Sequence, residues 1–476
     1  MSLVSKNKVA LLTLISAILY FSFAYFLERI AFYKLTFLWV FLFGCFYLLM
    51  KKNTLSFTNL VIISILFRLI FLFSIPNLSQ DFYRFIWDGR MILKGFNPYL
   101  SLPETFIQQG FYPISEASEL YHGMGGLNGS HYTNYPPLNQ LCFLIAALFS
   151  SKSIFGSVII LRLLIILADI GILYFGKKLL ENLNLPIKNI FWYGLNPFII
   201  IELTGNLHFE SVMIFFLIWG LYKLQQQKWV LAGILIACSI SIKLIPLLFL
   251  PLFYQWFVKG GILANNLKEP IDEKEIIATE TPLKRWIPAF TEMKRLLLFY
   301  TITLGTTLLF FLPFYTSELV TNYTSSVSLW FRDFEFNASF YYLFREIGYF
   351  FRGWNEILFI GKVTPILTIL FIITISLFRK NITLVQLITA LLFGLCFYYF
   401  TATTVHPWYL ATPIILSVFT KYKFPIVWSL VIILSYQGYS NIPWKENLWL
   451  VAIEYFIVFS FLIYEIKRIR VKKLTI

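Results

Sequence analysis

Residues 57–76 of the chain read FTNLVIISILFRLIFLFSIP, and residues 80–100 follow closely as QDFYRFIWDGRMILKGFNPYL. The first stretch is an apolar run of the length that a helix needs to cross a membrane. The second stretch brings charged side chains, a tryptophan and an Asn-Pro-Tyr turn together directly behind it. This order predicts a membrane-spanning helix that delivers a polar segment to one face of the membrane.

The rest of the chain repeats the apolar character of residues 57–76. Of its 476 residues, 58% are hydrophobic, 20% are aromatic and only 13% are charged, which excludes an ordinary water-soluble domain. The pattern predicts an all-α, polytopic bundle of about 13–14 spans, and no stretch alternates as a barrel strand does. We expect spans at residues 9–28, 33–50, 57–76, 154–176, 187–203, 207–225, 229–258, 296–315, 355–378, 382–402, 407–420, 424–440 and 447–467.

The net charge of +15 reflects membrane topology. Nearly all basic clusters fall on one side if the N-terminus is cytoplasmic, as the positive-inside rule requires. We therefore expect no nucleic-acid partner. The same orientation places two long polar loops, residues 77–135 and 316–354, on the outer face.

The apolar runs and loops divide the chain into four expected parts. These are N-terminal transmembrane helices at 1–56, a core at 57–258 that includes outer loop 77–135, a charged cytoplasmic linker at 259–295, and C-terminal transmembrane helices at 296–476 with outer loop 316–354. Residues 136–150 are short for a crossing, and we expect a partial hairpin there. Residues 229–258 are too long for one crossing, and we expect two short helices that meet near Lys243.

The polar segment after residue 76 has the pattern of a helix. Ser79 can cap its N-terminus, and Asp81, Arg84 and Asp88 then fall on one face. The aromatic and aliphatic residues between them supply apolar surface, so we expect an amphipathic helix at the membrane interface with its polar stripe turned toward a cavity. A surface helix that is merely held by an Asp–Arg pair is an equal alternative on the pattern alone.

Further polar residues interrupt the apolar runs where spans should reach the surface. They are Tyr135, Glu202, Asn206, His208, Glu210, Lys243, Arg332, Arg345, His406 and Trp408. A cation inside a span costs roughly 2.5 to 3.5 kcal/mol on insertion scales, so such residues usually face a partner, a cavity or a substrate. Lys243 in particular requires an anion.

Other charged residues are expected to be structural. We expect Arg162 and Asp169, two helical turns apart, to form an ion pair, and Arg68 to pair with Glu202 or Glu454. No close set of His, Asp and Glu recurs at the spacing of metal ligands. We therefore expect neither a metal ion nor another cofactor.

Together these motifs resemble the C-type (GT-C) integral membrane glycosyltransferases. Residues 80–90, followed by GFNPY at 95–99, are similar to the first outer loop of that superfamily. The chain also resembles the polyprenol-phosphate-mannose-dependent branch of that superfamily. The residues that carry this resemblance are Tyr135-Pro136-Pro137, Leu195-Asn196-Pro197, Gly205-Asn206-Leu207-His208, Lys243 and His406-Pro407-Trp408-Tyr409. Many members have an acidic pair before this helix, whereas this chain has Gln80-Asp81. Asp81 is thus the sole carboxylate at that point.

The resemblance implies a GT-C-like catalytic core at 57–258 and a transferase. The enzyme would move a hexose, with mannose as the first choice, from a polyprenyl-phosphate donor to a glycan or lipid acceptor on the outer face, with inversion and Asp81 as general base. The implied residues for the donor phosphate and sugar are Arg84, Lys243, Arg332, Arg345, His406 and Trp408. Those implied for the acceptor or the cavity wall are Asp88, Tyr135, His208 and Glu210. The other expected partners are membrane lipids, and the expected location is a bacterial inner membrane.

A transporter or flippase of lipid-linked saccharides is the alternative function. It would also need buried charges and broken helices, such as the one expected at 229–258. A transporter has no need, however, of a long outer loop that carries a carboxylate-bearing helix, and the hydropathy shows no twofold repeat. We therefore expect an enzyme.

Overall fold

A computed structural model describes residues 3–51, 55–259, 282–332, 334–441 and 443–474. Seven helices in this part of the chain are long and apolar enough to cross a membrane. They are α1 (Leu3–Phe26), α2 (Phe32–Lys51), α8 (Ile154–Asn182), α15 (Pro282–Phe311), α18 (Ile357–Phe378), α19 (Leu384–Thr401) and α22 (Leu448–Leu474). The expected all-α, multi-pass membrane bundle is confirmed.

The other expected spans are shorter or interrupted helices. The π-helix η2 (Ile199–Gly205) and α10 (Glu210–Gln225) form one pair bent by 112°. The shorter apolar elements are α3 (Phe57–Ile70), α7 (Pro137–Phe149), α11 (Trp229–Ile242), η3 (Ile245–Phe253) with α12 (Tyr254–Val258), η5 (Pro407–Leu410) with α20 (Ala411–Val418), and α21 (Phe424–Val431) with η6 (Ile432–Ser440). Pro246 and Pro407 stand in the first turn of η3 and η5, where a missing backbone donor is tolerated, and Pro251 lies inside η3, where it removes one.

The sequence predicts a break within residues 229–258 and a charged linker at 259–295. The two helices expected within residues 229–258 are present, because α11 ends before Lys243, whose backbone is extended, and η3 begins at Ile245. The charged linker expected at 259–295 falls largely on residues 260–281, which lie outside the described residues. Helix α15 already begins at Pro282 and ends in η4 (Leu312–Phe314).

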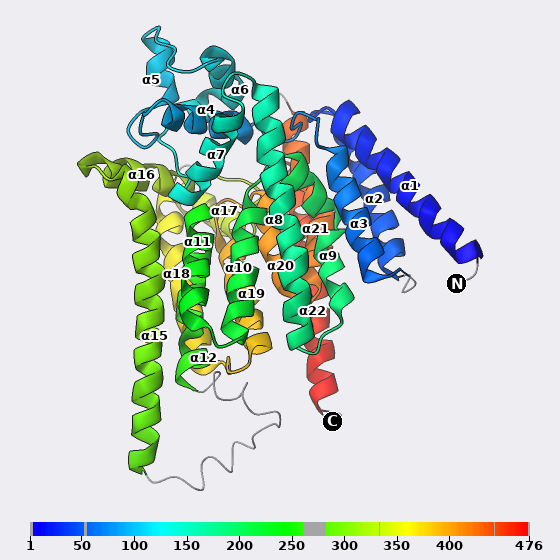
Figure 1. Cartoon of the computed structure of the whole chain (residues 1–476), viewed down its shortest axis with the longest axis vertical. Helices are drawn as coiled ribbons and strands as arrows, with labels where there is room; N and C mark the ends of the chain where they lie inside the picture. The colour runs from blue at the N-terminus through cyan, green and yellow to red at the C-terminus, as the bar shows by residue number, and fades with distance from the viewer. Residues whose placement is uncertain (1–2, 52–54, 260–281, 333, 442, 475–476) are drawn as a thin grey trace.

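Three helices between α3 and α7 form a cap over one end of the bundle (Figure 1). They are α4 (Asp81–Leu93), α5 (Pro103–Gln108) and α6 (Ala117–Gly129). Helix α16 (Ser317–Arg332) lies at the same end, whereas the first residues of α15 and the C-terminus lie at the other end (Figure 1). The polar segments expected on one face of the membrane therefore do share one end of the bundle.

Helix α4 is buried on nearly all sides by the helices around it. The N-cap is Gln80 and not the expected Ser79, although the Ser79 hydroxyl accepts a hydrogen bond from the backbone N–H of Asp81 at 3.3 Å. Phe85 stacks on Phe143 of α7 with 4.6 Å between the ring centroids. At Gly89 the two backbones touch, because a Cβ there would lie 2.2 Å from the carbonyl oxygen of Phe143. The apolar side chains of α4 thus pack on protein rather than on lipid.

The buried charges pair differently from the expectation. Among the described residues, Asp169 of α8 pairs with Arg68 of α3 at 2.7 Å rather than with Arg162, and both partners are only 1% exposed. The two carboxylates expected to bind Arg68, those of Glu202 and Glu454, instead accept hydrogen bonds from other side chains. Sequence spacing along one helix did not reveal these partners, because each pair joins different helices.

The guanidinium of Arg162 in α8 binds backbone carbonyl groups instead of a carboxylate. It donates four hydrogen bonds of 2.7 to 3.0 Å to the carbonyl oxygens of Leu72, Ser74, Thr204 and Gly205. These carbonyls lie just after α3 and at the end of η2, where helical hydrogen bonding stops. One side chain therefore satisfies the backbone at two helix ends.

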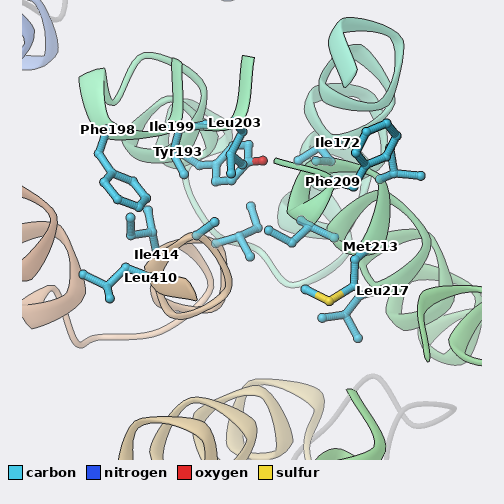
Figure 2. Packing of buried hydrophobic residues seen from close by; sticks show 14 of the residues in the cluster. Ile172, Tyr193, Phe198, Ile199, Leu203, Phe209, Met213, Leu217, Leu410 and Ile414 are labelled. Carbon is cyan, nitrogen blue, oxygen red and sulfur yellow. The ribbon is translucent and has the colours of Figure 1, made fainter. Parts of the chain in front are cut away.

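The core lies where α8, α9 (Phe191–Gly194), α10 and α20 meet (Figure 2). Helix α9 follows the short η1 (Ile187–Ile190). Ile172, Tyr193, Leu217 and Ile414 from these four helices are all fully buried. By contrast, α18 leaves apolar side chains outside, including Phe378, which is 81% exposed. A helix that faces lipid has this distribution.

The contact at Gly89 yields a stability prediction. Gly89→Ala should force α4 and α7 apart and cost ~1–3 kcal/mol, as overpacking usually does. The midpoint of thermal unfolding in detergent should fall. Gly44→Ala in α2 is the matched control, because a Cβ there meets nothing within 4 Å and a glycine-to-alanine change within a helix gains ~0.5–1 kcal/mol. Equal midpoints for the two variants would contradict the close contact of α4 with α7.

Candidate active site

A cavity of about 650 Å³ lies between the start of α4, the loop after α6, the first turn of α10 and the break at Lys243. Seven of the candidate residues line it, namely Asp81, Arg84, Tyr135, Glu210, Lys243, His406 and Trp408. Asp88, His208 and Arg345 lie outside this lining in the described part of the chain. Arg332 ends α16, but its side chain lies outside the described residues.

Asp81 is the first residue of α4, and its side chain is partly buried in the cavity wall. One carboxylate oxygen lies 3.5 Å from the amide nitrogen of Asn128, which donates a long hydrogen bond. Burial raises the pKa of the Asp81 carboxyl above its ordinary value, while Lys243, Asn128 and Arg29 act in the opposite direction. A weakly bonded carboxylate with a raised pKa is a better proton acceptor than a fully solvated one.

Arg84 and Asp88 form a buried ion pair beside Asp81. The Nε of Arg84 lies 2.7 Å from Oδ1 of Asp88, and Gln140 donates to the other carboxylate oxygen at 3.0 Å. Arg84 also donates to the carbonyl oxygens of Asn128 and His131, at 2.6 and 2.9 Å. The pair therefore fastens the end of α6 and the loop after it onto α4, as expected if the Asp–Arg pair is structural.

The break between η2 and α10 presents two further candidates. Leu207 is fully buried and has a φ of +63°, a conformation that costs a non-glycine residue free energy. Such strain persists only where the surrounding packing enforces it, and it clusters at functional sites. The turn places His208 behind the cavity wall and Glu210 in the wall itself.

Lys243 binds the carboxylate of Glu210. The ammonium nitrogen lies 2.5 Å from Oε1 of Glu210, and the two side chains are 18% and 3% exposed. Oε2 of Glu210 has no hydrogen-bond partner among the described residues. The anion that Lys243 requires is therefore supplied by the protein itself.

Trp408 lies between two histidines. Its ring stacks on His208 with 3.9 Å between centroids and on His406 with 4.5 Å. The segment before His406 is pinned to the chain after α16, because the backbone N–H of Val405 donates to the carbonyl oxygen of Phe336 at 2.8 Å. Pro407 then starts η5. The result is a rigid aromatic stack beside the cavity.

Arg345 lies away from these residues on α17 (Phe340–Arg352). It pairs with Glu335 at 2.7 Å and with Glu346 at 3.1 Å, and its guanidinium lies 4.5 Å from the ring centroid of Tyr342. These contacts hold the segment after α16 together. The structure does not bring Arg345 into the described lining of the cavity.

Arg29 is a cation in the cavity wall that sequence reasoning missed. It follows α1, and its guanidinium lies 3.4 Å from the ring centroid of Tyr439, which also lines the cavity. A signal was available, because an arginine in the expected outer connection between the first two spans goes against the positive-inside rule. Asn128 in α6 was missed as well, and nothing in the glycine-rich sequence around it marked it.

One wall of the cavity is apolar. It consists of residues from the start of η3 and from α18, namely Leu244, Ile245, Leu247, Leu248, Pro365 and Ile369. Ile369 is also 53% exposed. The polar end of the cavity is thus continuous with a surface that suits a hydrocarbon chain.

The N-terminal half of the chain is similar to known proteins. Residues 5–259 match the family described as "Alpha-(1->6)-mannopyranosyltransferase, N-terminal domain". A curated relative, Alpha-(1->6)-mannopyranosyltransferase A of Corynebacterium glutamicum, is 25% identical over 232 residues, which are 46% of this chain and 41% of that protein. The match thus spans about two fifths of the relative's length. Because the family match covers more than half of the chain and includes Asp81, Glu210 and Lys243, the chain belongs to the alpha-(1->6)-mannopyranosyltransferase family.

Proposed function

We propose that the protein transfers a hexose, with mannose as the first choice, from a polyprenyl-phosphate donor to a hydroxyl group of a glycan or lipid acceptor. The observation that carries this proposal is that Asp81 and Lys243 line one cavity, so a proton acceptor and a cation for phosphate share it. Membership of the family supports mannosyl transfer. We place the reaction on the outer face of a bacterial inner membrane, in line with the basic clusters expected on the opposite side.

The proposed reaction is a single displacement. Asp81 takes the proton of the acceptor hydroxyl while its oxygen forms a bond to the anomeric carbon. The bond from that carbon to the phosphate oxygen breaks on the opposite face, and its electron pair leaves with the polyprenyl phosphate. Attack and departure on opposite faces invert the anomeric centre. The scheme uses no metal ion.

The cavity offers a separate place for each part of the donor. Lys243 and Arg29 are suited to the phosphate, because hydrogen bonds between cations and phosphate oxygens are short and strong. Trp408 lines the cavity while its ring stacks on two histidines, so it is suited to bounding the sugar with the edge of its ring. The wall of η3 and α18 can take the polyprenyl chain. Arg84 is suited to positioning the loop around the sugar, since its hydrogen bonds already go to that loop.

The first test of the proposal is Asp81→Asn. The amide keeps the shape of the side chain but cannot accept a proton, so turnover should fall ~10²- to 10⁴-fold while donor binding is largely retained. Purified protein, polyprenyl-phosphate mannose and a lipid or glycan acceptor suffice for the measurement. Wild-type transfer by the variant would reject Asp81 as the base.

Asp88→Asn is the control for this test. Asp88 lies outside the cavity lining and pairs with the buried Arg84, so its loss should lower the thermal midpoint more than Asp81→Asn does. Its effect on turnover should be smaller than that of Asp81→Asn. If the wild-type protein carried lipid-linked saccharide across liposomes without forming a glycosidic bond, a flippase would replace the enzyme.

A second test concerns pH. The base must be ionised, so turnover should fall as the pH drops through the pKa of Asp81, which burial raises above that of an ordinary aspartate. Lys243 counters this rise, and Lys243→Gln should therefore move the acid limb of the turnover profile to higher pH at saturating donor. Lys228→Gln removes the same charge at an exposed position outside the cavity lining and should leave the limb in place. Identical limbs in both variants would contradict the coupling of Lys243 to Asp81.

A further inference from the structure

The ion pair of Lys243 and Glu210 bears directly on how a donor would bind. Both side chains line the cavity, and the ammonium of Lys243 is already held at 2.5 Å by a carboxylate that is 3% exposed. A phosphate that used Lys243 would meet this carboxylate at the same nitrogen. The two anions are therefore competitors.

The surroundings of Glu210 suit a carboxylate that can release its partner. Glu210 is the first residue of α10, where the positive end of the helix dipole favours a negative charge. Its other oxygen accepts no hydrogen bond from another described residue, so besides Lys243 the carboxylate is stabilised there by the N–H of its own backbone. Asp81 adds another negative charge to the cavity, whose other cations are Arg29 and Arg84, and an arriving phosphate would be a second anion beside the ammonium of Lys243.

We propose that Glu210 is a stand-in for the donor phosphate. It holds the ammonium of Lys243 in the empty cavity, and a phosphate monoester or diester on a lipid displaces it. This inference rests on the proposed function, since it assigns the phosphate to Lys243. In these terms Glu210 is a positioning residue. It holds the ammonium of Lys243 in place in the cavity wall, and a ligand must bind more strongly than this ion pair to displace it.

The competing explanation is a permanent structural ion pair. A permanent pair predicts that removal of the Glu210 charge leaves a buried lysine without its counterion, lowers stability and weakens ligand binding. A stand-in predicts the opposite sign for binding, because the ligand no longer has to break an ion pair. The sign of the affinity change therefore separates the two explanations.

The experiment measures binding of polyprenyl phosphate, which carries no sugar, to the full-length protein in lipid nanodiscs. Glu210→Gln should bind it about tenfold more tightly than the wild-type protein, equivalent to about 1.4 kcal/mol. Uncharged polyprenol should bind both proteins equally. In the double variant Glu210→Gln with Lys243→Gln the gain should vanish, because the cation that both anions use is gone.

Glu335→Gln is the matched control, because Glu335 neutralises Arg345 at 2.7 Å outside the described cavity lining. It should leave the affinity unchanged. A gain in this variant alone would move the phosphate to Arg345 and overturn the proposal. If Glu210→Gln unfolds at a lower temperature, Glu210→Asp withdraws the carboxylate by one methylene and should also tighten binding.

Transfer of mannose by the same preparations separates this inference from the function on which it rests. A wild-type protein that transfers mannose, with no gain in affinity in either Glu210 variant, would leave the function standing and reject the stand-in role. A gain in affinity together with no transfer would retain the anion site and reject the transferase.

Discussion

The guanidinium of Arg162 makes a broken helix possible inside the membrane. Backbone carbonyls without partners cost several kcal/mol each in hydrocarbon, and the ends of α3 and η2 both leave such carbonyls behind. Arg162, itself fully buried, donates to both sets. The chain after α3 leads to Asp81, and the chain after η2 leads to Glu210. One side chain of α8 thus fixes the two segments whose carboxylates share the cavity.

The charges in the cavity depend on one another. Lys243 lies against Glu210 and also favours the ionised form of Asp81. Any change in the partner of Lys243 therefore alters the field at Asp81. In the proposed reaction, a phosphate that takes over the ammonium would also change the strength of Asp81 as a base. Phosphate binding and proton acceptance would then be coupled through a single side chain, although the two carboxylates come from different helices.

Local signals explain what the sequence could predict. Run lengths reveal the membrane helices, and a lysine or an Asn-Pro pair inside a run reveals a break, so Asp81, Lys243 and His406 could be expected to meet. Partners distant in the chain leave no such signal. Arg29 meets Tyr439 from the opposite end of the sequence, and the bonds of Arg162 go to carbonyls, which no residue type identifies. The amphipathic pattern of α4 likewise does not show that α6 and α7 pack against it.

The apolar wall of η3 and α18 determines which measure of donor concentration would govern the rate of such an enzyme. A donor that enters along this wall arrives by diffusion within the leaflet, and Ile369 marks where the wall reaches the outside. The quantity that governs its encounter rate is then the number of donor molecules per unit area of bilayer. Adding inert lipid would slow the reaction, whereas diluting the whole suspension would not. Two cells with equal total donor could thus differ in rate solely through their membrane area.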